Sequence, residues 1–140
     1  MQQRLTLITL GVRDVKASTE FYTSVFGWKP LPSSNENITF FQLNGIQLAL
    51  FGDHALAEDA GVGAEGTGFR KFSLAHNMRS EKEVDDLVAG LSRKGATVMK
   101  MPQKVFWGGY SSYVQDPDGI LWEIAFNPYM QLDEAGNVVG

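Results

Sequence analysis

The feature that most constrains the fold is an order of predicted elements that occurs twice along the chain. Each half of the sequence indicates a strand, a helix ended by a glycine, a short strand and then a hairpin of two strands. The helix-ending glycines are Gly27 and Gly95, and the hairpin glycines are Gly45 and Gly119. Equivalent glycines are separated by nearly the same number of residues, which is typical of an internal duplication. The sequence therefore predicts two βαβββ modules.

The first module is expected to cover residues 4–51. Asp14 is a residue type that favours the N-cap of a helix. Asn44-Gly45, between alternating apolar residues, is the strongest short-range signal for a hairpin. The strands of this module are expected at 4–12, 28–31, 38–43 and 46–51, and its helix at 16–26.

The second module is expected to cover residues 69–128 of a single domain that spans 1–140. Ser80 and Glu83 form a capping-box pattern at the start of a helix. The turn Asp116-Pro117-Asp118-Gly119 suits a left-handed glycine at its end. The strands of this module are expected at 69–75, 97–101, 110–115 and 121–126. The remaining segments are predicted to be a linker, 52–68, with a short helical piece at 55–60, and a C-terminal tail, 129–140.

The residues available as ligands limit metal and redox chemistry. The 140 residues include no cysteine and only two histidines, His54 and His76. Disulfides, thiol nucleophiles and cysteine-based metal sites are therefore excluded, and any metal would rest largely on carboxylates. His76 ends a predicted strand and His54 lies in the linker. We expect the first to be a structural hydrogen-bonding group and the second to be solvated.

Charge and targeting signals exclude several kinds of partner. The chain has 12 Lys and Arg against 16 Asp and Glu, a formal net charge of −4, and no basic cluster that would attract nucleic acid. The first residues lack the features of a signal peptide. No apolar run approaches the roughly 20 residues that a membrane helix needs. We therefore expect a cytoplasmic protein that binds neither nucleic acid nor membrane.

Glu123 is the carboxylate that the pattern singles out. It lies in an apolar predicted strand, where alternation places it on one face with Leu121 and Ala125. One interpretation is a glutamate that simply reaches solvent at the end of a strand. The other is a pocket carboxylate that acts as a base or anchors a ligand.

Aromatic residues in and after a glycine-containing loop are candidates for ligand contact. The segment 106–110 places Trp107 and Tyr110 around two glycines, and aromatic side chains beside a pocket suit stacking on a flat ligand. A three-residue hairpin loop puts Tyr113 opposite Glu123, whereas a two-residue loop puts Ser112 there. The Pro-Asp-Gly sequence favours Tyr113. A tyrosine next to a glutamate could handle protons or bind a hydroxyl group.

Two motifs resemble those of a known superfamily. They are GVRDVKASTEFYTSVFGW in the first module and DPDGILWEIAFNP in the second. With the two βαβββ modules, they resemble the vicinal oxygen chelate superfamily, which includes glyoxalase I, bleomycin resistance proteins, fosfomycin resistance enzymes and extradiol dioxygenases. The resemblance implies an α+β fold in which the two modules form a cupped mixed β-sheet, with a metal or ligand on its concave face. It also makes a homodimer an expectation.

The resemblance further implies where metal ligands would lie. Metal enzymes of the superfamily take one ligand from the first strand and one from the last strand of each module, usually His or Glu. These positions fall on Leu7 and Ala49 in the first module and on Lys71 and Glu123 in the second. Three of the four side chains do not suit a metal. We therefore expect no metal ligands, and we hypothesise that Lys71 and Glu123 form an ion pair where a metal would otherwise lie.

Three functions follow as hypotheses. The first is metal-independent binding of a small molecule, as in the drug-sequestering resistance proteins of the superfamily. In its most specific form, this hypothesis has an aromatic ligand. The second is a metal-dependent lyase, isomerase or dioxygenase of glyoxalase type, with a divalent metal as cofactor. The third is a metal-free enzyme that uses Glu123 with Tyr113. The residues predicted to bind the ligand are Leu7, Phe40, Ala49, Lys71, Trp107, Tyr110, Tyr113 and Glu123.

Overall fold

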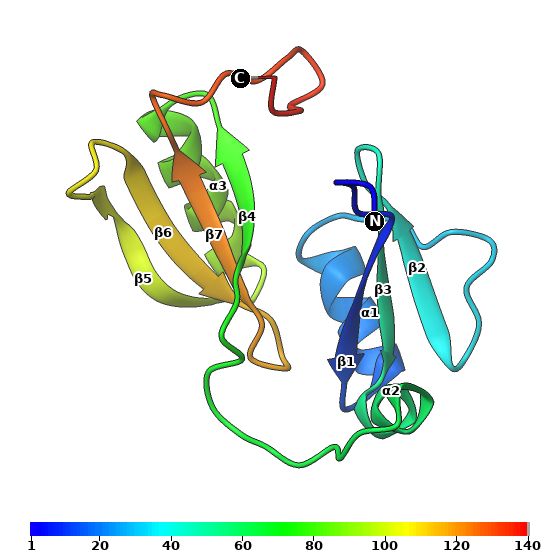
Figure 1. Ribbon diagram of the computed structural model, residues 1–140. Coiled ribbons are helices and arrows are strands. Elements are labelled where there is room, and N and C mark those ends of the chain that lie inside the picture. Colours follow the sequence, from blue (N-terminus) through cyan, green and yellow to red (C-terminus); the bar gives the residue numbers. More distant parts are fainter. Residues whose placement is uncertain (140) are drawn as a thin grey trace. The chain divides into compact units, whose positions relative to one another are not determined.

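Two β-sheets organise the chain. The computed structural model describes residues 1–139 and divides them into two compact units, Met1–Thr67 and the part from Gly68 onward. The first unit contains a three-stranded sheet in the order β1-β3-β2, and the second a four-stranded sheet in the order β4-β7-β6-β5 (Figure 1). Both sheets mix parallel and antiparallel pairs. The α+β class is confirmed, and each unit contains one of the two predicted modules, the first with a three-stranded sheet.

The first unit has one strand fewer than predicted. Its elements are β1 (Leu7–Val12), α1 (Val15–Ser24), β2 (Ile38–Gln42), β3 (Gln47–Gly52) and α2 (Asp53–Ala60). The short strand expected at 28–31 is reduced to a single bridge between Pro30 and Phe41. Pro30 and Pro32 have no backbone N–H to donate to a ladder, which explains the difference. The hairpin around Asn44-Gly45 is confirmed, since β2 and β3 pair antiparallel.

The second unit contains every predicted element, but its first strand begins later. Its elements are β4 (Leu74–Met78), α3 (Glu81–Arg93), β5 (Thr97–Lys104), β6 (Tyr110–Gln115) and β7 (Leu121–Phe126). The strand expected at 69–75 is wrong in its start, because Lys71 has a left-handed backbone with φ of 63°. A non-glycine residue in that conformation does not continue a strand. β5 passes through Pro102, which an edge strand tolerates, and its pairing with β6 shifts register twice.

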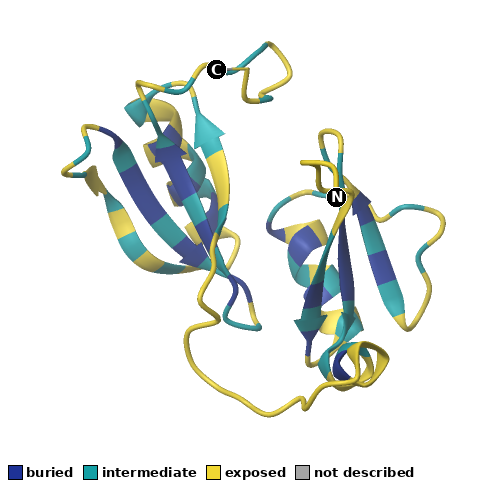
Figure 2. Ribbon diagram, in the orientation of Figure 1, coloured by how far each residue is buried: buried dark blue, intermediate teal, exposed yellow. Residues whose placement is uncertain are grey.

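Each sheet buries one face against a helix. α1 packs on β2 and β3, and α3 packs on β5, β6 and β7. Figure 2 shows buried residues along the middle strands of each sheet and exposed residues in the segment that follows α2. Alternation along β7 places Trp122 and Ile124 toward α3, and both are buried. Glu123 consequently lies on the opposite, helix-free face.

Ser80 caps the start of α3 as predicted, and Glu83 accepts from the residue before the cap instead of from Ser80. The Glu83 backbone N–H donates to the Ser80 hydroxyl at 3.2 Å, and the Arg79 backbone N–H donates to the Glu83 carboxylate at 2.8 Å. The Arg79 guanidinium also donates to the carbonyls of Leu132 and Glu134, at 3.4 and 3.3 Å. The C-terminal tail is therefore attached to the end of β4. Among the described residues, no helix has the length and apolarity to cross a membrane.

The turn between β6 and β7 is held by one buried carboxylate. Asp116 Oδ1 accepts hydrogen bonds from the backbone N–H groups of Asp118 and Ile120, both at 2.8 Å. Asp116 is buried, and Gly119 has the left-handed φ of 83° that the turn was predicted to need. These contacts set the register of the hairpin that carries Glu123.

We expect Asp116→Ala to lower the free energy of unfolding by about 1–3 kcal/mol, because it leaves two turn N–H groups without their acceptor. Asp116→Asn keeps an oxygen at this position and should lose less. Denaturant unfolding followed by circular dichroism measures both variants. Equal losses in the two would contradict the role given to the Asp116 oxygen.

Candidate binding site on the second sheet

The predicted pairing of Tyr113 with Glu123 is confirmed. The two residues are directly opposite in the β6–β7 register, whereas Ser112 lies opposite Ile124. Ser112 donates to the Ile124 carbonyl at 2.9 Å on the side of α3. Tyr113 and Glu123 line a pocket of about 370 Å³ on the helix-free face of the second sheet. The full lining is Lys100, Gln103, Lys104, Val105, Phe106, Trp107, Ser111, Tyr113 and Glu123.

Ser111 orients the pocket carboxylate. Its hydroxyl donates to Glu123 Oε1 at 2.6 Å, and Ser111 is only 2 % exposed. This hydrogen bond restricts the orientation of the Glu123 carboxylate, which lines the pocket. Ser111 was not predicted as a site residue. Its position two residues before Tyr113, on the same face of β6, was the signal that could have found it.

Tyr113 remains a neutral phenol over a wide pH range. Burial and the charge of Glu123 raise the pKa of Tyr113, and a hydrogen bond with the Ser73 side chain opposes them. A neutral phenol can donate a hydrogen bond as well as accept one. Tyr113 and Glu123 thus offer a donor and an acceptor side by side.

We expect the pKa of Tyr113 to fall toward its ordinary value in Glu123→Gln, because the neighbouring negative charge is lost. The pKa should stay above the ordinary value, since burial is the larger cause of the shift. The raised pKa favours the neutral phenol in the folded state. Its contribution to stability is therefore present below the unfolded-state pKa of tyrosine and lost as the pH rises through the folded-state pKa.

An absorbance titration of tyrosinate, with Tyr113→Phe subtracted, measures this shift. A titration unchanged by Glu123→Gln would show that the Glu123 charge does not reach the phenol.

The loop between β5 and β6 places an indole at the pocket. Val105 N–H donates to the Gly109 carbonyl and Gly108 N–H donates to the Val105 carbonyl, both at 3.0 Å. Gly108 has a φ of 92°, a conformation that glycine adopts without steric cost. Trp107 lines the pocket, as predicted, and Phe106 beside it is fully exposed.

Lys100 and Lys104 are the cations that line the pocket. Lys104 already pairs with Glu81 Oε1, at 3.7 Å. The predicted ion pair of Lys71 with Glu123 is not formed. Lys100 lies opposite Tyr113 in the β5–β6 register and lines the pocket. Lys71 is exposed and lies before β4 in the left-handed conformation described above. Extending the β4–β7 register back by one residue from Leu74 puts Ser73, not Lys71, at the position equivalent to Leu7 in the first unit.

Tyr110 does not belong to the pocket, which corrects the sequence prediction. Its hydroxyl donates to Asp85 Oδ1 of α3 at 2.9 Å. This hydrogen bond is the main cause that raises the pKa of Tyr110. Tyr110 and Tyr113 are three residues apart in one strand, so their side chains lie on opposite faces of the sheet.

The predicted site residues of the first unit share one face of its sheet. Ala49 lies opposite Thr9 on β1 and Phe40 on β2, and Leu7 lies two residues before Thr9 on the same face. Ala49 is fully buried, while Leu7 is 38 % exposed. None of these residues provides a polar side chain for chemistry.

The two histidines are outside the pocket of the second unit. His76 lies on β4 opposite Ile124, on the same face as α3. Partial burial lowers its pKa. The His54 backbone N–H donates to Asp53 Oδ1 in the first turn of α2.

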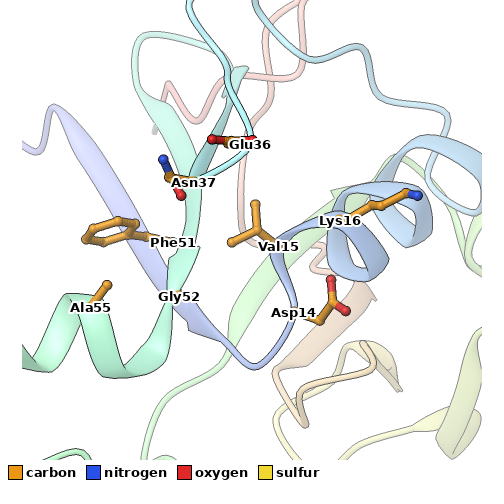
Figure 3. A pocket seen from close by; sticks show the side chains of 8 residues that line it. All are labelled: Asp14, Val15, Lys16, Glu36, Asn37, Phe51, Gly52 and Ala55. Atoms are coloured by element: carbon orange, nitrogen blue, oxygen red, sulfur yellow. The ribbon is translucent and has the colours of Figure 1, made fainter.

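A second pocket, of about 330 Å³, lies in the first unit between the starts of α1 and α2 (Figure 3). Asp14 and Lys16 line it on the side of α1, and Phe51 and Ala55 on the other side. Asp14 already accepts a hydrogen bond from the Ala17 N–H at 2.9 Å as the N-cap of α1. The lining of this second pocket includes none of the residues that the sequence predicts to bind the ligand.

The positions at which the resemblance implies metal ligands carry few side chains of metal-binding types. Within residues 1–139, no three His, Cys, Asp or Glu side chains come together as a metal site. The positions that the resemblance assigns to ligands carry Leu7, Ala49, Ser73 and Glu123. Of these four side chains, only that of Glu123 is of a type that commonly binds metals. It already accepts a hydrogen bond from the Ser111 hydroxyl.

The fold and the motifs now define the class of protein. The chain belongs to the Glyoxalase/Bleomycin resistance protein/Dioxygenase superfamily, which matches residues 4–124. It is 39 % identical to a glyoxalase-related enzyme from Fulvimarina pelagi of known crystal structure. The structural alignment of the two covers 99 % of each chain and has a TM-score of 0.87. A glyoxalase/bleomycin resistance protein/dioxygenase from Nocardioides is 27 % identical and covers 95 % of this chain and 91 % of its own, with a TM-score of 0.81.

A curated plant relative is similar over part of its length. Lactoylglutathione lyase GLX1 of Arabidopsis thaliana is 32 % identical in an alignment of length 130 that covers 87 % of this chain and 44 % of the relative. The chain therefore spans less than half the length of the curated relative it matches.

Proposed function

We propose that this protein binds a small planar molecule with an anionic group in the pocket of the second sheet, without a metal. Three different chemistries line that pocket. Trp107 offers a flat apolar surface, Lys100 a positive charge and Glu123 a hydrogen-bond acceptor. The observation that carries the proposal is the bond from Ser111 to Glu123, because it fixes a carboxylate for recognition in a pocket that lacks further metal-binding side chains.

The chemistry of the lining suggests a test compound. In 4-hydroxybenzoate, a ring separates a carboxylate from a hydroxyl donor. The carboxylate can pair with Lys100, the ring can stack on Trp107 and the hydroxyl can donate to Glu123. We use it as a probe of the binding class, not as the physiological ligand.

A calorimetric and thermal-shift screen tests the proposal. It should include 4-hydroxybenzoate, other aromatic acids, aromatic antibiotics, thiol conjugates and divalent metals. We expect aromatic acids to bind, Lys100→Met to weaken them, and Lys94→Met, at an exposed site after α3, to leave their affinity unchanged. Binding that is equal in the wild type and in both Lys100→Met and Trp107→Ala would contradict the pocket assignment.

The similarity to a plant lactoylglutathione lyase supports a second candidate, a lyase of that type, for which the family resemblance implies a divalent metal. Elemental analysis of protein purified without chelator separates the two candidates. Stoichiometric zinc, nickel, manganese or iron, together with lyase activity that a chelator abolishes, would overturn metal-independent binding. A third candidate, metal-free catalysis, is supported by Tyr113 directly opposite Glu123. It predicts turnover that a chelator leaves intact and that Tyr113→Phe removes.

A further inference from the structure

We propose that Gly109 is a positioning residue that sets the orientation of the Trp107 indole, and so makes this indole the flat wall of the pocket on which a ligand ring stacks. The inference rests on the proposed function in its second half, since stacking requires a planar ligand. Its first half, the orientation of the indole, depends only on the loop.

The indole lies directly on the backbone of Gly109. A Cβ atom at Gly109 would be 1.8 Å from Trp107 Cζ3, 1.9 Å from Cη2 and 2.7 Å from Cε3. Real Cβ atoms essentially never approach a heavy atom within 3.0 Å. Gly109 is also buried, although its neighbour Gly108 is exposed. Any side chain at position 109 would therefore displace the indole.

Glycine is favoured at the two loop positions, 108 and 109, for different physical reasons. Gly108 has the left-handed φ of 92°, which glycine adopts without steric cost, and a Cβ there would also lie 2.9 Å from the Tyr129 hydroxyl oxygen. Gly109 has no such φ, and its backbone would accept alanine. The steric requirement at Gly109 comes from the Trp107 ring.

The loop offers little room for the clash to be relieved by the backbone. Gly109 accepts from the Val105 N–H, and Ser111, two residues on, holds Glu123. A shift of the Gly109 backbone would disturb both contacts. The ring of Trp107, which is half-buried, is the part that can move. We therefore expect alanine at position 109 to rotate the indole away from its position in the pocket lining.

A double-mutant cycle tests the inference. The variants are Gly109→Ala, Trp107→Ala and the double variant, with Gly90→Ala of α3 as the matched control. A Cβ at Gly90 would meet only the end of the Arg93 side chain, at 3.8 Å. The readouts are near-ultraviolet circular dichroism, acrylamide quenching of tryptophan fluorescence, and affinity for 4-hydroxybenzoate by calorimetry.

We expect Gly109→Ala to change the dichroism band, to increase quenching and to weaken 4-hydroxybenzoate by about three- to tenfold, the range of one lost aromatic stack. In the Trp107→Ala background, the same substitution should change none of these, because the clashing ring is absent. Gly90→Ala should match the wild type in all three.

Unchanged tryptophan signals in Gly109→Ala would overturn the inference. If Gly109→Ala does not fold, a double variant that folds like Trp107→Ala supports it, and a double variant that also fails to fold overturns it. Changed signals in a protein whose wild type binds no planar acid would support the orientation of the indole and contradict the proposed function, so the two failures are distinguishable.

Discussion

Replacing Glu123 by alanine is expected to weaken the binding of 4-hydroxybenzoate by about tenfold to a hundredfold. A hydrogen bond to a charged group contributes roughly 1.5–3 kcal/mol, and a factor of ten in affinity is about 1.4 kcal/mol. The effect should be large because Ser111 already holds one carboxylate oxygen, at 2.6 Å. The carboxylate therefore loses little side-chain freedom when the ligand binds. Isothermal calorimetry measures the difference.

Two controls separate a specific loss from a general one. Benzoate lacks the hydroxyl donor, so its affinity should not fall in Glu123→Ala. Glu134→Gln removes a carboxylate from the exposed tail and should leave both ligands unaffected. A parallel loss for benzoate and 4-hydroxybenzoate would show that Glu123 does not accept the hydroxyl. Ser111→Ala should weaken only 4-hydroxybenzoate, and by less than Glu123→Ala.

The largest loss of stability is expected from Phe41→Ala in the first unit. Phe41 is 1 % exposed, and its ring centre lies 5.6 Å from that of Trp28 and 5.9 Å from that of Tyr22. Removing a buried phenylalanine leaves a cavity that its neighbours fill only in part. We expect a loss of about 3–5 kcal/mol in the free energy of unfolding, measured by denaturant unfolding followed by tryptophan fluorescence.

Phe69→Ala is the matched control, because Phe69 is 68 % exposed. Exposed substitutions of this kind usually change stability by less than about 0.5 kcal/mol. Because Phe41 belongs to the first unit and the candidate site to the second, folded Phe41→Ala protein should still show the tyrosinate titration of Tyr113. A loss of stability no larger than that of Phe69→Ala would contradict the core assignment of Phe41.

The sequence predicts most of the fold because local signals fix the elements. The pair Ser80 and Glu83 sets the start of α3, and the turn from Asp116 to Gly119 sets the register of β6 with β7. That register in turn predicts Tyr113 opposite Glu123. Each of these inferences depends on neighbours in sequence, where turn chemistry and capping are decisive.

The residues that were missed or misplaced depend on other information. Lys100 lies opposite Tyr113 only because the β5–β6 pairing shifts register between Val98 and Lys100, and irregularities of this kind carry no clear sequence signal. Lys71 was misplaced because a left-handed lysine is not recognisable from residue type. The assignment of Tyr110 to the pocket was an error that the sequence itself could have prevented. Tyr110 is an odd number of residues from Tyr113 in the same strand, so the two side chains lie on opposite faces of the sheet. The folding of the Trp107 ring onto Gly109 is a tertiary contact that residue patterns do not contain.

The order of strands has a consequence for how the chain folds. In each unit the first strand pairs with the last: β1 pairs parallel to β3, and β4 pairs parallel to β7. Such non-local pairs require closure of a long loop before they stabilise anything, which slows folding. During synthesis, β4 has no partner until β7 has emerged, and α3, β5 and β6 are made in between. The strand that carries Glu123, β7, is therefore also the strand that completes the second sheet, because it joins β4 to β6.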